Sequence, residues 1–469
     1  MVSKPVTRLR AVTMAGLVLA LTAAVLAVTG PAEAARRPAP RALRVTAYQG
    51  SLVVRWHAVR KAHGYKVRWS TRRSMSGSSR LAAPVRRARI GGLAPDTRYF
   101  VQVAVAAHRG QGRRLGPWSK LVARRTPPPP CPTTGNLGDP TPAVPTGRDT
   151  DLRVASFNIR TINLDSGLYP QQRWASRADR VASLLLGAAT SRNAATTPPD
   201  VIALQEANQS YAKFSARCTN QMIDLRNRLD AGSGRHYEAT SLNPSASVGT
   251  RILFDTGRLR LERAGSVLLA PASALHPPLA WAVFQERDGG QRFFFGSVHL
   301  VPPDSPDSNL VRDAEWDRLL ALLADPTLTG GLPVVIAGDF NSRRSGAGAN
   351  TSAVTHLPRM WSAGVGDTLT GKEDAADPGL LVGAARAKAT ANAQCESFNG
   401  FRVEQKCDDQ ANPADETVGQ DIDYVFASNA LTVKAWELVL DLDPLRNWLG
   451  TIPSDHNLVR TTITLPGVS

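Results

Sequence analysis

The chain of 469 residues is poor in cysteine and methionine, and it has almost no long apolar runs. Its four cysteines include no Cys-x-x-Cys pair, the spacing from which structural zinc sites are usually built, so a zinc finger is excluded. Only residues 11–30 form an uncharged apolar run long enough to span a bilayer, which excludes a protein with many transmembrane helices. Hydrophobic residues still make up 42% of the chain, too many for a disordered protein.

The first 34 residues have the features of a secretory signal peptide. Lys4, Arg8 and Arg10 precede the apolar run, and Ala32-Glu33-Ala34 supplies the small-x-small pattern that signal peptidase accepts. We therefore predict that residues 1–34 are removed and that the protein is secreted, either free or associated with the cell wall. The alternative is that the run remains as a membrane anchor.

Export would place Cys131, Cys218, Cys395 and Cys407 in an oxidising compartment. Four cysteines allow three pairings. Because Cys395 and Cys407 close a short loop, we predict that they pair, which leaves Cys131 with Cys218. The alternative is that the thiols are free and buried.

Acidic residues are nearly absent from residues 36–126, where 22 lysines and arginines face a single acid, Asp96. Residues 131–469 hold 31 basic and 37 acidic side chains, so the basic character belongs to the first segment alone. Such a charge suits a polyanion, since every basic contact with phosphate releases counterions. The segment is therefore expected to bind DNA or an anionic cell-wall polymer, or else to keep the protein soluble. No obligate protein partner is implied.

Residues 42–126 are expected to form a small all-β sandwich. Apolar residues recur at every second position in residues 52–56, 65–69 and 99–105, as in half-buried strands. The segment resembles a fibronectin type III domain, in which Trp56 would be the buried tryptophan. The pattern Leu93-x-Pro95-x-Thr97-x-Tyr99 is similar to that family's turn and tyrosine corner. Residues 127–150 hold eight prolines and are expected to form an extended linker.

Residues 151–467 follow a different pattern, in which short apolar runs end in polar residues. The runs end at Asn158, at Gln205 and Glu206, at His299 and at Asp339, and helical patterns at residues 177–188 and 312–323 lie between them. Buried strands that alternate with helices predict a layered α/β domain, and strand ends are where such sheets place their chemistry.

These polar residues belong to six motifs that occur in order along the chain. They are Ser156-Phe157-Asn158-Ile159, Leu204-Gln205-Glu206, Ser297-Val298-His299-Leu300, Gly338-Asp339-Phe340-Asn341, Ile422-Asp423-Tyr424 and Ser454-Asp455-His456. Together they resemble the endonuclease/exonuclease/phosphatase superfamily, which includes deoxyribonucleases, sphingomyelinases and 5-phosphatases. The resemblance implies a four-layered α/β (α+β) sandwich flanked by helices, and a metal-dependent phosphoric-ester hydrolase.

The expected site is a metal centre beside a group of acid–base residues. Mg²⁺, with Mn²⁺ as an alternative, would be held mainly by Glu206, with Asn158 and Asp455 completing or supporting the site. His456, oriented by Asp423, would act as a base or contact the phosphate. The remaining catalytic residues would be Asp339, which activates the water, Asn341, which holds a phosphate oxygen, and His299.

Hydrolysis of phosphodiester bonds in extracellular DNA is the preferred function. His299 resembles the second histidine of the deoxyribonuclease, sphingomyelinase and 5-phosphatase branches. Arg160 stands where AP endonucleases have an acid, which disfavours a repair enzyme. One alternative is a phospholipid, sphingomyelin or sugar-phosphate phosphodiesterase, for which residues 436–448 are the nearest candidate for membrane contact. The other is a catalytically inactive cell-surface binding protein.

Two features of the sequence leave the site incomplete. An active-site tyrosine is typical of the superfamily, and Tyr211, Tyr237 and Tyr424 are all candidates. About 80 residues separate Asn341 from the strand expected to begin at Asp421, without clear periodicity, and we expect this insertion to form one wall of the cleft.

Overall fold

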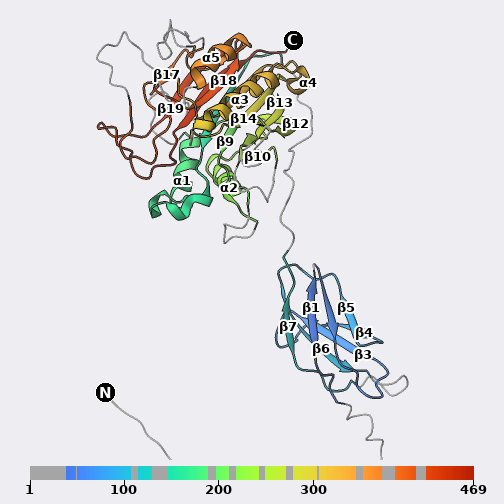
Figure 1. Ribbon diagram of the computed structural model, residues 1–469. Helices are drawn as coiled ribbons and strands as arrows, with labels where there is room; N and C mark the ends of the chain where they lie inside the picture. The colour runs from blue at the N-terminus through green and yellow to red at the C-terminus, as the bar shows by residue number, and fades with distance from the viewer. Residues whose placement is uncertain are drawn as a thin grey trace, which may run out of the picture. The chain divides into compact units, whose positions relative to one another are not determined.

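The computed structural model describes residues 38–48, 50–106, 115–128, 146–187, 197–210, 218–241, 249–270, 278–303, 306–344, 352–371, 386–407 and 419–468. The chain divides into two compact units, Met1–Pro130 and Cys131–Ser469 (Figure 1). Among the described helices, none is long and apolar enough to cross a membrane. The predicted signal peptide and most of the proline-rich linker lie outside the described residues, so both stay predictions.

The first unit is the expected β-sandwich. A three-stranded sheet of order β1-β2-β5 packs on a four-stranded sheet of order β4-β3-β6-β7, and all pairs are antiparallel. The Tyr99 hydroxyl accepts a hydrogen bond from the Ala94 N–H at 3.0 Å, as the tyrosine-corner pattern predicts, and Trp56 is buried in the core. The strands are β1 Arg44–Tyr48, β2 Ser51–Arg55, β3 Tyr65–Ser70, β4 Ser79–Ala83, β5 Arg87–Ile90, β6 Arg98–Val105 and β7 Val122–Arg125.

The second unit is built on two large sheets that pack face to face. One has the strand order β10-β11-β9-β8-β20-β19-β17 and the other β12-β13-β14-β15-β18-β16. The strands are β8 Thr150–Asn158, β9 Val201–Gln205, β10 Tyr237–Ala239, β11 Arg251–Asp255, β12 Leu259–Val267, β13 Leu279–Glu286, β14 Arg292–His299, β15 Val334–Asp339, β16 Val365–Asp367, β17 Thr390–Ala391, β18 Asp423–Ser428, β19 Thr432–Val439 and β20 Leu458–Leu465.

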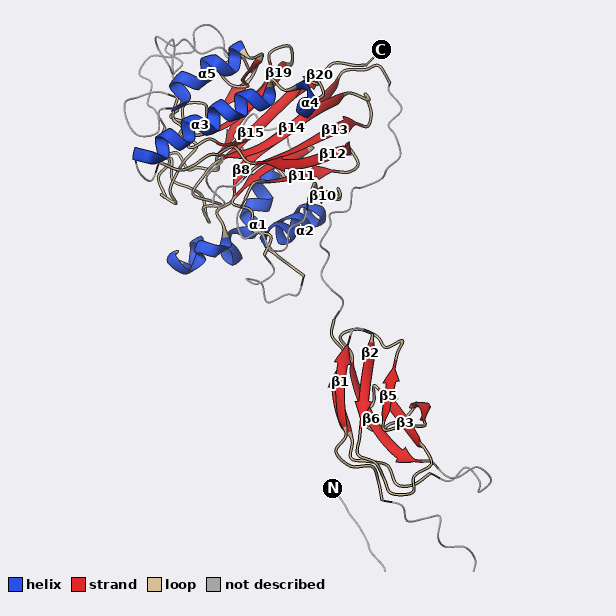
Figure 2. Ribbon diagram, turned by 45° about the vertical axis from the view of Figure 1, so that its right-hand side comes forward, coloured by secondary structure: helices blue, strands red, loops and turns tan. Residues whose placement is uncertain are grey.

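Helices cover the outer faces of both sheets and complete four layers (Figure 2). Helices α1 (Trp174–Leu185) and α2 (Gln221–Ser233) pack on the seven-stranded sheet, while α3 (Pro306–Leu323) and α5 (Ser352–Ser362) pack on the six-stranded sheet. Short helical segments are η2 Ile162–Gly167, η3 Pro170–Gln172 and α4 Pro326–Thr329. The predicted fold class is therefore confirmed.

Alternation along each strand divides the core between the layers. In β13, Ala282 and Phe284 face the other sheet, while Leu279 and Val283 face the helices. Every residue of β9 and β15 is buried, as expected of strands covered on both faces.

Two pairs of parallel strands place their carboxyl ends at one edge of the sandwich. In the seven-stranded sheet, β8 and β9 end together with Asn158 opposite Gln205. In the six-stranded sheet, β14 and β15 end with His299 opposite Asp339, and Asp339 also faces Asp423 of β18. The polar residues that end the apolar runs therefore meet at this edge, as the sequence predicts.

Several predicted bounds were wrong. Helix α1 covers Trp174–Leu185 rather than residues 177–188, α3 begins at Pro306 rather than at Arg312, and β18 begins at Asp423 rather than at Asp421. The insertion after Asn341 also contains α5, β16 and β17, which its weak periodicity did not indicate. Helix α5 has Pro358 in its interior, and a proline there normally argues against a helix.

The insertion also contains the disulfide Cys395–Cys407, which confirms the predicted local pair. The second predicted pair includes Cys131, which lies outside the described residues.

Candidate active site

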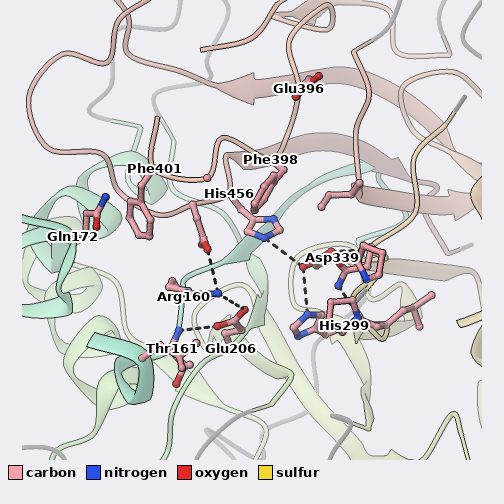
Figure 3. A pocket seen from close by; sticks show the side chains of 18 of the residues that line it. Arg160, Thr161, Gln172, Glu206, His299, Asp339, Glu396, Phe398, Phe401 and His456 are labelled. Carbon is pink, nitrogen blue, oxygen red and sulfur yellow. Dashed lines mark hydrogen bonds and ion pairs between the residues drawn. The ribbon is translucent and has the colours of Figure 1, made fainter. Parts of the chain in front are cut away.

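A cleft of about 940 Å³ opens over the strand ends (Figure 3). Its polar floor contains Glu206, His299, Asp339, Asp455 and His456. Its walls include residues of the insertion, among them Glu396, Phe398, Gly400 and Phe401. The expectation that the insertion forms one wall of the cleft is therefore confirmed.

One carboxylate oxygen of Asp339 is the meeting point of three nitrogen atoms. Asn158 Nδ2 lies 3.0 Å from Asp339 Oδ2, His299 Nε2 lies 3.4 Å away and His456 Nε2 lies 3.6 Å away. The other oxygen, Oδ1, accepts a hydrogen bond from the Asn341 N–H at 2.9 Å. Residues from four of the six motifs thus surround a single carboxylate.

His456 is oriented by Asp423, as predicted. Its Nδ1 lies 2.9 Å from Asp423 Oδ2, and both side chains are buried. Burial alone would lower the pKa of this imidazole, but the negative charges of Asp423 and Asp339 outweigh burial and raise the pKa of His456. The two carboxylates therefore favour the protonated ring, whose Nε2 is directed at the cleft.

His299 lies on the opposite side of Asp339. Its Nε2 faces the carboxylate, while its buried Nδ1 has no hydrogen-bond partner within the described part of the chain. An unpartnered buried nitrogen beside a cleft is available to a ligand or a water.

The contacts of Glu206 favour its ionised carboxylate, the form that binds a cation. The Thr161 N–H donates to Glu206 Oε2 at 3.0 Å, and Arg160 Nη1 lies 3.7 Å from Oε1. Burial would raise the pKa of this carboxyl, but His299, the Thr161 N–H and Arg160 outweigh burial and keep the pKa of Glu206 below its ordinary value. Glu206 also has a φ of 56°, a backbone conformation that is strained for a residue with a side chain.

Arg160 joins Glu206 to the third predicted ligand. Its Nη1 lies 3.3 Å from Asp455 Oδ2, so one positive charge stands between the two carboxylates. Because these oxygens already share a cation, Glu206 and Asp455 fit a divalent ion, which prefers oxygen ligands. Asn158 was predicted to complete or support this site, and its contacts fit a supporting position. It turns its amide nitrogen toward Glu206 at 3.3 Å, and its oxygen accepts the Arg160 N–H.

A second group of residues could also supply metal ligands. Asp339, Asp423 and His456 place one ligand atom each within 4.8 Å of one another. However, the bond between Asp423 and His456 Nδ1 occupies one side of the imidazole, and the pKa of His456 is raised, which favours a protonated ring. Asp339 Oδ2 and Asp423 Oδ2 are thus already engaged by nitrogen atoms, so Glu206 and Asp455 are the better pair.

Asn341 lines the cleft, but its amide nitrogen donates to the Leu300 carbonyl at 2.9 Å. Its φ of 48° is a second strained conformation at the site. The predicted contact between Asn341 and phosphate would have to coexist with this bond.

Two of the three tyrosine candidates, Tyr237 and Tyr424, do not line the cleft. The Tyr237 hydroxyl donates to the Pro199 carbonyl, and the Tyr424 hydroxyl lies 2.7 Å from the Ser342 carbonyl oxygen and 2.9 Å from that of Asp421. Tyr211 lies outside the described residues. Neither Tyr237 nor Tyr424 is therefore an active-site tyrosine.

Two groups of supporting residues were not predicted from the sequence. The first is Arg177 of α1, which is buried and donates to the carbonyls of Ile159, Arg160 and Pro453. It ties the loop after β8 to the loop that precedes Asp455. Its only signal in the sequence was a charged residue on an otherwise apolar helix face.

The second group lies in the disulfide-closed loop, residues 395–407. Ser397 and Asn399 of this loop are buried and form hydrogen bonds to the segments that carry Asp423 and His456. Ser397 Oγ accepts from the Asp423 N–H, and its carbonyl accepts from the Asn457 N–H. The Asn399 N–H donates to the Asp455 carbonyl and its Nδ2 to the Ser454 carbonyl. No pattern in the sequence indicated these residues.

Comparisons with known proteins agree with both predicted resemblances. The model of the endonuclease/exonuclease/phosphatase family matches residues 155–456, and that of the fibronectin type III domain matches residues 38–123. No curated protein matches the chain significantly.

Solved structures similar to the chain include an endonuclease/exonuclease/phosphatase family protein from Bacteroides thetaiotaomicron, with 18% identity and a TM-score of 0.45 over 68% of this chain and 99% of that one. A mannosyl-6-phosphatase from the same organism has 16% identity and a TM-score of 0.44 over 67% of this chain and all of that one, 100%. The human Nocturnin catalytic domain, solved with bound sulfate, has 18% identity and a TM-score of 0.42, over 67% and 93%.

Proposed function

Because the chain belongs to the endonuclease/exonuclease/phosphatase family, we propose that its cleft hydrolyses phosphodiester bonds and that its substrate is nucleic acid, above all extracellular DNA. The observation that carries the proposal is the meeting of Asn158, His299 and His456 around Asp339 Oδ2. A carboxylate between two imidazoles supplies both a proton acceptor and proton donors within one small space.

Phosphodiester hydrolysis requires a base for the water and positive charge on the phosphate oxygens. Mg²⁺ bound at Glu206 and Asp455 would supply charge to the nonbridging and leaving oxygens. Asp339 accepts the proton of the attacking water. Asp423 and Asp339 favour the protonated form of His456, which would donate from Nε2 to a phosphate oxygen, so the phosphate-contact role is favoured over the base role. His299 donates from the other side of the cleft.

Nucleic acid is favoured over lipid by the described surface. Trp436 and Trp448, in the segment expected to contact a membrane, are only 2% and 5% exposed, although Leu445 is 76% exposed. This segment therefore offers no exposed aromatic hairpin. The strongly basic first unit, in contrast, suits a polyanion. We further propose that the protein is secreted, because the apolar run and cleavage pattern of residues 1–34 are typical of export.

The test is an assay of the purified full-length chain with Mg²⁺ on four substrates: supercoiled plasmid, RNA, sphingomyelin and inositol phosphates. We expect nicking of the plasmid, loss of activity in EDTA and its return with Mg²⁺ or Mn²⁺. Faster release of phosphorylcholine from sphingomyelin, or of phosphate from the inositol phosphates, would contradict the nuclease assignment. The assay would then identify the alternative substrate class.

A further inference from the structure

Three arginines stand side by side across the three-stranded sheet of the first unit. Arg44 of β1 lies opposite Arg55 of β2, and Arg55 lies opposite Arg87 of β5. All three side chains are exposed. Like charges directly opposite one another on neighbouring strands destabilise a sheet, so this row, called the arginine row below, costs the fold stability.

The arginine row has no counter-charge within its own unit. None of the three guanidinium groups has a hydrogen bond or an ion pair to any described residue. Some other arginines of the sandwich have partners: Arg68 bonds to Gln102, and Arg125 pairs with Asp96 at 3.1 Å. Because Asp96 is the single acid of residues 36–126, the segment has no other carboxylate to offer the arginine row.

The surface is hollowed beside the arginine row. Arg55, Arg86 and Arg87 line a hollow of about 360 Å³, together with Val85, which is 61% exposed. Two members of the row therefore border a concave surface, together with a fourth arginine that also has no described side-chain partner. This combination of concavity and unpaired positive charge is suited to an anion.

We propose that the arginine row and its hollow bind the phosphate backbone of nucleic acid. The choice of nucleic acid as ligand rests on the proposed function of the cleft. Neighbouring strands are about 4.8 Å apart, so the row presents three charges along a line of about 10 Å. A nucleic acid backbone presents its own charges along a line, with one per about 1.7 Å of duplex axis. Residues 131–469 have an excess of acids, so capture of a polyanion falls to this unit.

The test compares two triple variants of the full-length chain for binding to a fluorescent 20-base-pair duplex in EDTA, which stops hydrolysis. R44Q/R55Q/R87Q removes the arginine row. R72Q/R73Q/R98Q removes the same charge from exposed arginines of the four-stranded sheet, since Arg72 and Arg73 follow β3 and Arg98 begins β6. Each contact with phosphate contributes about 0.9 to the slope of log K against log salt. We therefore expect the row variant to lose about 2.7 of that slope and its affinity at 50 mM salt to fall at least tenfold. The control variant should lose less than 1 of the slope of log K against log salt.

Equal losses in the two variants would overturn the proposal, because binding would then follow net charge alone. The proposal would also be overturned if the row variant lost binding to phosphatidylglycerol vesicles but bound DNA as tightly as the wild type. Thermal melting controls for folding, and the row variant should melt no lower than the wild type because repulsion is relieved. The small diester bis-p-nitrophenyl phosphate, assayed with Mg²⁺, reports on the cleft separately. If the row variant loses duplex binding while the wild type cleaves no nucleic acid, the binding site stands and only the proposed substrate fails.

Discussion

Ser397 holds the backbone of Asp423. Ser397 Oγ accepts hydrogen bonds from the N–H groups of Ile422 and Asp423 at 2.9 and 3.1 Å, and the Ser397 carbonyl accepts from the Asn457 N–H at 2.7 Å. Because Asp423 orients His456, one buried serine fixes the backbone on both sides of the bond between them. Ser397 is a positioning residue that never reaches the cleft.

Ser397→Ala should therefore lower kcat while leaving KM nearly unchanged. The variant leaves two buried N–H groups without an acceptor, which costs about 1–3 kcal/mol, and misplacement of His456 should reduce kcat about 10- to 100-fold. The measurement is steady-state hydrolysis of bis-p-nitrophenyl phosphate, with Ser266→Ala on the exposed part of β12 as control. A purely structural serine would lower the melting temperature and leave kcat per folded molecule unchanged.

Glu206→Ala should abolish binding of the metal as well as activity. Mn²⁺ binding to the purified protein, followed by electron paramagnetic resonance, gives a readout that does not depend on turnover. The exposed Glu404→Ala variant is the matched control and should bind Mn²⁺ as the wild type does. Wild-type Mn²⁺ affinity in the Glu206 variant would show that the metal sits elsewhere, with Asp339, Asp423 and His456 as the next candidate set.

His456→Ala should reduce kcat by about 10³-fold or more, because it removes the proton donor that Asp423 orients. The fold should persist, since this side chain lies at the floor of a cleft rather than in a packed core. Circular dichroism and kinetics measured on the same preparation test this. His236→Ala is the control, because that side chain is 60% exposed and does not line the cleft. Turnover within tenfold of the wild type would remove His456 from the mechanism.

Glu315 of α3 predicts a pH dependence of stability. Burial raises the pKa of its carboxyl to about 7, although the Val301 N–H, at 2.8 Å, favours the charged form. Because the folded protein binds this proton more tightly than the unfolded chain, protonated Glu315 contributes its full stability below about pH 4.5. This contribution is lost as the pH rises through the folded pKa of about 7. Glu315→Gln keeps the acceptor and cannot ionise.

The variant should therefore gain up to about 3 kcal/mol of unfolding free energy over the wild type at pH 8.5 and nothing at pH 4.5. Urea denaturation at the two pH values measures the difference, with the exposed Glu404→Gln as control. Equal stabilisation at both pH values would mean that ionisation of Glu315 is not the cause.

The strand ends could be predicted from the sequence because their signals are local. A buried apolar run that stops at Asn158 or His299 predicts both the strand and the polar residue at its carboxyl end. The pairing of His456 with Asp423 followed from the resemblance. The orientation of the Asn158 amide could not be predicted, because it depends on Glu206, Asp339 and the Arg160 N–H, which only the fold brings together.

The supporting residues were beyond sequence reasoning for the same reason. Arg177 is a charged residue within an apolar helix face, and its four acceptors are backbone carbonyls, which carry no sequence signal. Ser397 and Asn399 lie in an insertion without periodicity, and their partners are more than 20 residues away. Contacts between side chains and distant backbone leave no pattern along a chain.

The loop that contains Ser397 is closed by the bond between Cys395 and Cys407, and such bonds persist only where oxidants prevail over cellular thiols. A cell that makes a nuclease carries its own genome within reach of the newly made enzyme. Before oxidation, nothing covalent holds the loop against the segments of Asp423 and His456, so the newly made chain would be a weak catalyst. If the protein is the secreted nuclease proposed above, these two cysteines would keep it weakly active until it reaches an oxidising compartment.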